Sequence, residues 1–556
     1  MAIDSPAQGT SDSTPVADTA TTETERESAA GSSTWSALRP LVLRIHFYAG
    51  LLVAPLLLIA AASGLLYALS LQAEKIVYSH ELTAPVGDRV LPLGEQVEAA
   101  RGFRPDGTVT AVWPGAEDGA TTRVLMDAPG VDEGKSLAVF VDPYTAEIRG
   151  DLTSYGGSGA LPLRSWLDEL HRDLHLGEFG RYYSELAASW LWVVALGGLL
   201  LWLGRGRRGK RALFVPERGA KGRRRTLSWH GTVGLWAVVG LVLLSATGLT
   251  WSRYAGENIG AVQDQLGGST PAVSAALEGG TAAPAGEHAG HGGGATAPHQ
   301  GADVGIDAAL ESARAAGIGR ELAITLPVDG TGYVIKERDT HFPVQLDSVA
   351  VNPADGTVMD TLRFADYPLL AQLTRYGIDA HMGVFLGLPN QLALAALALA
   401  LILLIVWGYR MWWLRRPTRG RSATRAAGAA KAGETGGVGE TSGAAQAVGT
   451  AKADETTDAG TATQAAGTAN APGASAGTAQ TGGGPKASGG AARSRRFGGR
   501  PVPRGTWRRI PLTALLPIAA VTALVAWFVP LLGVTLAAFL VFDLAVGAVA
   551  RVRART

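Results

Sequence analysis

The sequence predicts an α-helical membrane protein with about six transmembrane helices and two α+β domains outside the membrane. Two observations support this fold class. Apolar stretches of about 20 residues, the length needed to cross a bilayer, occur six times. The first four flank two long outer segments, so that the chain reads as two span–domain–span repeats followed by a two-span hairpin. Composition agrees, since only 17% of the 556 residues are charged, against roughly 25% in a soluble domain.

The order of segments follows from where the apolar stretches begin and end. We expect a disordered head (1–36), the first span (37–71), an outer domain (72–170), an approach segment and second span (171–204), a basic loop (205–226), the third span (227–253), a second outer domain (254–375, with 278–301 flexible), an approach segment and fourth span (376–416), a disordered linker (417–505) and a two-span hairpin (506–556). The linker is rich in Ala, Gly and Thr and has almost nothing with which to build a core.

Basic residues indicate the orientation. The loop 205–226 contains ten Arg and Lys residues and a single acid, Glu217. Short loops rich in Arg and Lys stay in the cytoplasm. Both termini are therefore expected inside the cell, and the two long segments outside it.

Several classes of function are excluded by composition. The 49 basic and 48 acidic residues nearly cancel, which argues against nucleic-acid binding. The chain has no cysteine, so it forms no disulfide, iron–sulfur cluster or covalently attached haem. It also lacks a phosphate loop, a flavin or nucleotide motif and a recognisable catalytic set.

The internal repeat aligns one histidine and two glycines of the first span with the same residue types in the third. These are His46, Gly50 and Gly64, which align with His230, Gly234 and Gly248. Histidine and distal glycine are 18 residues apart in both copies. On one continuous helix this is five turns, so the two residues would share a face about 27 Å apart.

The segments leading into the second and fourth spans also match. One reads Asp-Leu-His175-Leu-Gly and the other Asp-Ala-His381-Met-Gly. In the outer domains, alternating apolar runs end at Asp142-Pro143 and at Asn352-Pro353, a pattern typical of a strand running into a turn.

Residues 37–416 resemble the PepSY-associated transmembrane proteins, also called iron-regulated membrane proteins. The resemblance rests on Arg44-Ile-His46, Ser63-Gly64, His175-Leu-Gly177 and the strand end at Asp142-Pro143. It implies that the outer domains are small PepSY domains and that the protein acts in iron homeostasis. The family includes ferric-siderophore reductases, some of them fused to cytoplasmic flavin reductase domains; this chain carries no such fusion.

The four repeat-related histidines are candidate haem ligands. His46 and His230 are expected at the cytoplasmic ends of their spans, and His175 and His381 at the outer ends. Facing imidazoles in a helical bundle hold b-type haem without cysteine. We therefore expect two haems, with Gly50 and Gly234 opening the inner slot and Gly64 and Gly248 the outer one.

Other residues leave the ligand set open. His171, one turn before His175, is an alternate ligand. Arg44 and Arg253 could face the haem propionates. The Gly-rich tract with His288, His291 and His299 could bind copper or zinc loosely.

The expected function is a membrane oxidoreductase that passes electrons outward to ferric iron or a ferric siderophore. A cytoplasmic flavin reductase or a quinol would be the donor. Two alternatives remain open: a non-enzymatic, membrane-anchored PepSY protein that binds or senses a peptide, and an accessory to iron or copper uptake.

Overall fold

The computed structural model describes residues 34–205, 211–277, 299–319, 321–415 and 510–553. The predictions made for the head 1–33, the linker 417–505 and nearly all of the flexible stretch 278–301 fall outside these ranges, and residues 34–36, predicted to be disordered, begin a helix.

Five of the described helices are long and apolar enough to cross a membrane. They are α3 (Ala54–Val77), α7 (Gly177–Leu203), α9 (Gly222–Leu249), α13 (Leu388–Trp413) and α16 (Pro530–Arg553). The expected fifth span corresponds to α15 (Leu512–Phe528), which is apolar but has only 17 residues. The described residues therefore contain five candidate spans and one shorter apolar helix.

The first predicted span is not one helix. Helix α2 (Thr34–Leu52) ends at a break before α3, and Pro55 stands in the first turn of α3. Proline has no N–H, so it cannot donate to the carbonyl four residues earlier. Here that carbonyl belongs to Leu51, and it accepts a hydrogen bond from the hydroxyl of Tyr409 at 2.9 Å.

This break changes the geometry expected for the first repeat. His46 lies on α2 and Gly64 on α3, so the five-turn argument does not apply to them. It does apply to the other copy, because His230 and Gly248 both lie on α9.

Both predicted outer segments contribute to a single antiparallel sheet. Its order is β4-β3-β2-β1-β5-β6-β7-β8. The strands are β1 (Thr108–Trp113), β2 (Thr122–Asp127), β3 (Lys135–Val141), β4 (Ile148–Tyr155), β5 (Leu322–Thr325), β6 (Tyr333–Glu337), β7 (Ser348–Val351) and β8 (Val358–Leu362). The strands of the two predicted α+β domains pair across the repeat boundary, where Val112 of β1 lies opposite Ile324 of β5.

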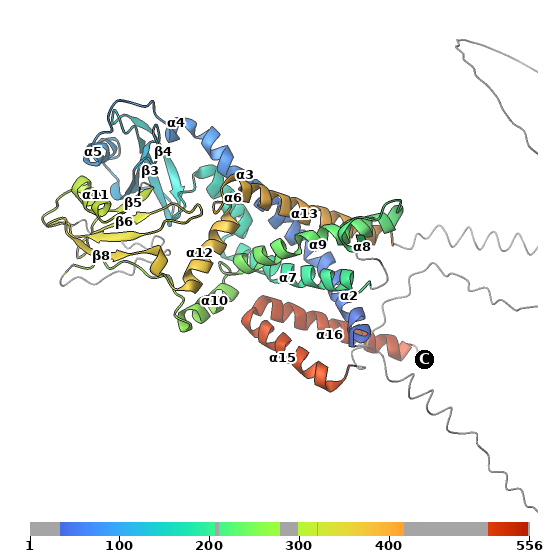
Figure 1. Ribbon diagram of the computed structural model, residues 1–556. Helices are drawn as coiled ribbons and strands as arrows, with labels where there is room; N and C mark the ends of the chain where they lie inside the picture. The colour runs from blue at the N-terminus through green and yellow to red at the C-terminus, as the bar shows by residue number, and fades with distance from the viewer. Residues whose placement is uncertain (1–33, 206–210, 278–298, 320, 416–509, 554–556) are drawn as a thin grey trace, which may run out of the picture. The chain divides into compact units, whose positions relative to one another are not determined.

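Two helices cover one face of this sheet, α5 (Leu93–Phe103) and α11 (Ile306–Ala315) (Figure 1). Their apolar residues pack with those of the strands in one core. Asp307 of α11 accepts from the backbone N–H groups of Leu93 and Gly94 at 2.7 and 2.9 Å, which ties the two copies together. The turns predicted after β3 and β7 are present, with matching backbone bonds from Ala146 to Asp142 and from Gly356 to Asn352.

Shorter helices connect the sheet to the long helices or join these to one another. They are α4 (Ser79–Leu82), α6 (Pro162–Asp173), α8 (Arg211–Phe214), α10 (Tyr254–Gln265), the 3-10 turn η2 (Phe364–Asp366) and α12 (Leu369–Met382). Helices α6 and α12 each run into a long helix, α7 and α13.

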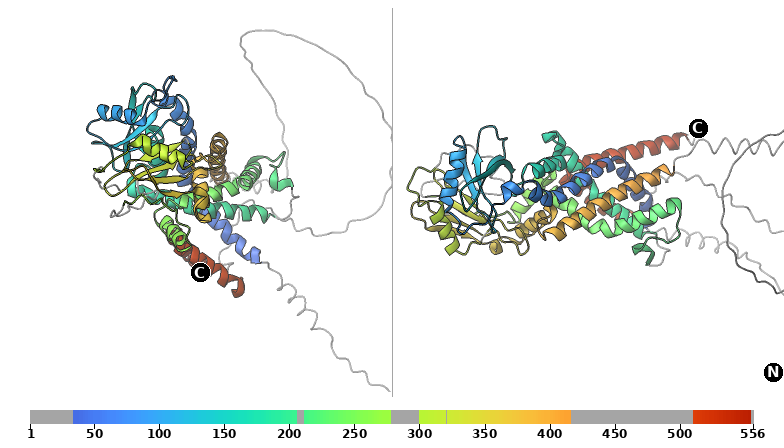
Figure 2. Two further views of the ribbon diagram at one scale, coloured as in Figure 1. Left: turned by 60° about the vertical axis from the view of Figure 1, so that its left-hand side comes forward. Right: turned by 90° about the horizontal axis from the view of Figure 1, so that it is seen from above.

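The C-terminal hairpin of α15 and α16 packs against α2 and α7 (Figure 2). Trp190 of α7 donates to the hydroxyl of Thr535 at 2.9 Å. Arg44 of α2, only 3% exposed, forms an ion pair with Asp543 of α16 at 3.1 Å. The hairpin is thus bound to the bundle by polar contacts as well as by apolar packing.

Candidate functional site: two histidine pairs

The inner pair consists of His46 on α2 and His230 on α9. The centres of the two imidazole rings are 6.3 Å apart, and the ring planes cross at 79°. The internal repeat predicted that these two residues lie close together, and they do so in the fold.

Each ring of the inner pair is bonded to the backbone of a further helix. The Nδ1 atom of His46 lies 2.9 Å from the carbonyl oxygen of Val194 on α7, and that of His230 lies 3.0 Å from the carbonyl of Leu404 on α13. A carbonyl only accepts, so a neutral ring must carry its proton on Nδ1. Each Nε2 atom is then left with a free lone pair, the state in which histidine binds metal.

The space for the His46 ring comes from a glycine that sequence reasoning missed. A Cβ atom added at Gly198 would lie 2.9 Å from Cε1 of His46, whereas one at the neighbouring Gly197 would lie 3.9 Å from the same side chain. At Gly50 an added Cβ would meet nothing within 4 Å, and at Gly234 only Leu404 at 3.7 Å. The Gly-Gly pair within the second span was the signal for this close approach.

At the other end of the bundle, the structure gives His171 the position that matches His381. His381 lies at the end of α12 and His171 near the end of α6. Their Nδ1 atoms bond to matching hydroxyls: His171 to Ser63 at 2.9 Å, and His381 to Thr247 at 2.7 Å. We call His171 and His381 the outer pair.

His175, which we had expected opposite His381, lies elsewhere. Its ring packs on Trp166 at 4.9 Å, its Nδ1 atom is 3.1 Å from Glu169, and its side chain is 30% exposed. The reason is local: α6 ends at Asp173, and both Leu174 and His175 adopt left-handed backbone conformations, with φ of 58° and 56°. The chain turns there. His171, one helical turn before His175, therefore occupies the position in the first repeat that corresponds to His381 in the second.

Gly64 and Gly248 stand behind the outer rings. An added Cβ at Gly64 would lie 3.2 Å from Cε1 of His171, and one at Gly248 would lie 3.5 Å from Cε1 of His381. These glycines make room for the imidazole rings. Their equivalent positions behind the two rings agree with the internal repeat of the sequence.

The position of α6 is fixed from both sides. On one side Arg164 of α6 forms a buried ion pair with Glu74 of α3 at 2.8 Å. On the other side, two arginines of the sheet region donate hydrogen bonds to the loop before α6. Arg123 donates to the carbonyl of Gly159, and Arg338 donates to that of Gly157. Helix α6, which carries His171, is therefore bonded both to the sheet and to the spanning helix α3.

These two sheet arginines are crowded around one tryptophan. The guanidinium of Arg338 lies 3.5 Å from the ring centre of Trp113, and that of Arg123 lies 5.9 Å from it. Burial, followed by repulsion from Arg123, lowers the pKa of Arg338 to about 10. Both side chains still carry a charge at neutral pH, and this cluster was not apparent from the sequence.

The arginines expected near haem propionates bond to carboxylates. Arg44 pairs with Asp543, and Arg253 pairs with Glu178. Within the described ranges, no group of three or more His, Cys, Asp or Glu side chains gathers as a metal site. His288 and His291 lie outside those ranges.

The fold and its histidines define a multi-pass membrane protein in which apolar helices carry one antiparallel sheet at one end and hold a pair of imidazoles at each of two levels. The chain belongs to the family described as PepSY-associated TM region, which matches residues 43–415. A search of curated proteins finds no match. The family match ends before the C-terminal hairpin.

Proposed function

We propose that the protein is a transmembrane electron carrier that holds one b-type haem between His46 and His230 and a second between His171 and His381. The inner pair is the observation that carries the proposal. Its two rings come from different repeats, lie edge to face inside an apolar bundle and are each bonded through Nδ1 to a backbone carbonyl.

His46 and His230 would hold the iron of a haem bound at the inner level. Metal–imidazole bonds are about 2 Å long, so two rings bound to one metal ion have centres about 6 Å apart. The observed separation is 6.3 Å. Haem held by two imidazoles supplies a one-electron carrier, whose chemistry belongs to the cofactor. The chain's part is to present both Nε2 lone pairs and to exclude water.

Orientation is the second part of the proposal. We place the basic loop 205–226 and both termini in the cytoplasm, and the sheet outside. Two termini on the same side require an even number of spans. Helix α15 supplies the sixth, because its 17 residues reach the lower limit of about 17 for a transmembrane helix.

With this orientation electrons would move outward. The outer pair lies on α6 and α12, which connect to the sheet. An acceptor bound at the sheet would therefore be nearer to the outer pair than to the inner pair. Ferric iron, free or held by a siderophore, is the acceptor that the family resemblance favours. A reduced flavoprotein or a quinol would supply electrons at the cytoplasmic end.

The experiment uses membrane vesicles of both orientations and a ferric chelate that cannot cross the membrane. Reduction should require donor on the cytoplasmic side and chelate on the outer side, and His381→Ala should abolish it. Equal rates with the chelate on either side would contradict outward transfer. A purified protein without a haem absorption band would instead favour the PepSY binding or sensing alternative, or a role as an accessory to iron or copper uptake.

A further inference from the structure

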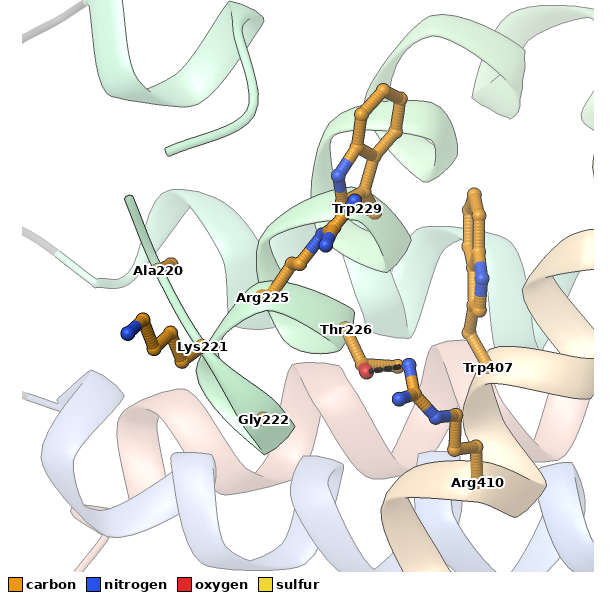
Figure 3. Close-up of a pocket in the computed structure, with 8 residues that line it drawn as sticks. All are labelled: Ala220, Lys221, Gly222, Arg225, Thr226, Trp229, Trp407 and Arg410. Atoms are coloured by element: carbon orange, nitrogen blue, oxygen red, sulfur yellow. Dashed lines mark hydrogen bonds between the residues drawn. The ribbon is translucent and has the colours of Figure 1, made fainter. Parts of the chain in front are cut away.

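A cavity of about 550 Å³ lies between the N-terminus of α9 and the C-terminal half of α13, at the end of the bundle remote from the sheet (Figure 3). Six of the side chains around it are Lys221, Arg225, Thr226, Trp229, Trp407 and Arg410. None of them belongs to the histidine pairs described above.

The charge of this cavity is entirely positive. Lys221, Arg225 and Arg410 contribute cations, and none of the residues lining it is acidic. The acid of the neighbouring loop, Glu217, is already bonded to Arg224 at 3.0 Å. The first backbone N–H groups of α9 also begin here, without a side-chain cap from Lys221. A ligand that balances these groups must be an anion.

The walls of the cavity are aromatic. The rings of Trp229 and Trp407 are 6.2 Å apart, and Trp229 is 42% exposed. Tryptophan in this position is typical of the interface between the lipid headgroups and the hydrocarbon. The matching ligand therefore has an apolar body next to its negative charge. A neutral quinol fits less well, because no carboxylate is present to accept its protons.

We propose that this cavity binds the phosphodiester headgroup of an anionic phospholipid from the leaflet at this end of the bundle. Basic pockets between transmembrane helices bind such headgroups in the cytoplasmic leaflet, the side on which the orientation proposed above places this end. The phosphate would contact Lys221 and Arg225, and its glycerol and acyl chains would lie against the tryptophans.

The bound lipid would hold together two helices that already share one polar link. Arg410 of α13 donates to the hydroxyl of Thr226 of α9 at 2.8 Å. His230 follows Thr226 by one helical turn, and its backbone acceptor, Leu404, precedes Trp407 on α13. The lipid therefore stabilises the part of the bundle that positions the inner pair, whether or not haem is bound there.

The test compares the full-length protein in bilayer discs of phosphatidylcholine with discs that also contain phosphatidylglycerol. The readouts are the thermal unfolding midpoint and the lipid retained in native mass spectrometry. Phosphatidylglycerol should raise the midpoint of the wild-type protein. The double variant Lys221→Gln/Arg225→Gln should lose this rise and retain the lipid about 30-fold less, because each of the two cations contributes about 1 kcal/mol.

The matched control removes two charges from the same region but outside the cavity, with Arg211→Gln/Arg218→Gln, both at exposed positions. It should behave as the wild type. Equal losses in the two double variants would overturn the proposal, since general surface charge would then explain the effect. Free glycerol 3-phosphate, added to phosphatidylcholine discs, should give little protection. Protection equal to that of the lipid would assign the cavity to a soluble phosphate and also overturn it.

Discussion

The inner and outer pairs are related by the same internal repeat but are held differently. The inner rings bond to backbone carbonyls of Val194 and Leu404, and the outer rings bond to the hydroxyls of Ser63 and Thr247. A carbonyl cannot be removed by substitution, whereas a hydroxyl can. The bundle therefore contains one pair held by the fold itself and one that depends on two side chains.

Both arrangements nevertheless allow the ring proton to sit on the same nitrogen, Nδ1. The hydroxyl of Ser63 also donates to the carbonyl of Ile59 within its own helix, and that of Thr247 to Leu243. When each hydroxyl donates its one proton to that carbonyl, its oxygen accepts from Nδ1 of the histidine. Helices that differ in sequence thus present Nε2 at both levels.

The largest expected difference between the two ends comes from the ion pair between Asp543 and Arg44, which precedes His46 by two residues on α2. Asp543→Ala leaves Arg44 without its carboxylate partner, and breaking a buried pair costs about 3–5 kcal/mol. We expect a loss of that size in the free energy of unfolding and a disturbed inner pair, with the outer pair unchanged. Chemical denaturation in detergent measures the first, and the absorption spectrum of the haem the second.

The control for this prediction removes both charges. In Arg44→Leu/Asp543→Leu no charge is left unpaired, so much of the lost stability should return. A double variant as unstable as the single one would show that the ion pair itself does not explain the effect.

A smaller effect is expected from the glycine behind the His46 ring. Gly198→Ala places a methyl group 2.9 Å from Cε1 of His46, so the ring must move. Overpacking of this kind costs about 1–3 kcal/mol. Gly197→Ala, with 3.9 Å to the same ring, is the neighbouring control and should be tolerated. Equal changes in unfolding midpoint for the two variants would mean that the ring has room to shift.

The smallest effect should follow from removing one outer hydroxyl. Ser63→Ala or Thr247→Val deletes one hydrogen bond to an imidazole and should cost about 0.5–1.5 kcal/mol. We expect the spectrum of the haem proposed at the outer pair to change while that of the haem proposed at the inner pair stays the same. Redox titration would resolve the two, and a change confined to the inner haem would contradict the assignment.

Much of the fold could be predicted from hydrophobic length and the repeat, since spans must be about 20 residues long. The meeting of His46 with His230 followed from the same reasoning. The pairing of β1 with β5 could not be predicted. The alternation of apolar and polar residues in the strands would be the same if each half of the chain formed a sheet of its own. The break at Pro55 was visible as a proline but lies within an otherwise continuous apolar run.

His175 was predicted to lie opposite His381, and the structure places its ring elsewhere for a definite reason. Aligned letters matched Asp173 and His175 to Asp379 and His381, but a motif match does not show where a helix ends. The left-handed turn at Leu174 and His175 directs the His175 side chain away from this position. The bond from His171 to Ser63, which matches that from His381 to Thr247, shows that His171 occupies it. Gly198 was missed because it is not part of the repeat.

The most direct test of the two-pair account is the haem content and reduced-minus-oxidised spectrum of three purified variants beside the wild type. The account predicts two b-type haems per chain in the wild type. His46→Ala should lose one, His171→Ala should lose the other, and His175→Ala should keep both. Loss of a haem in His175→Ala with both retained in His171→Ala would contradict the outer pair, and four equivalent spectra would contradict haem ligation by either pair.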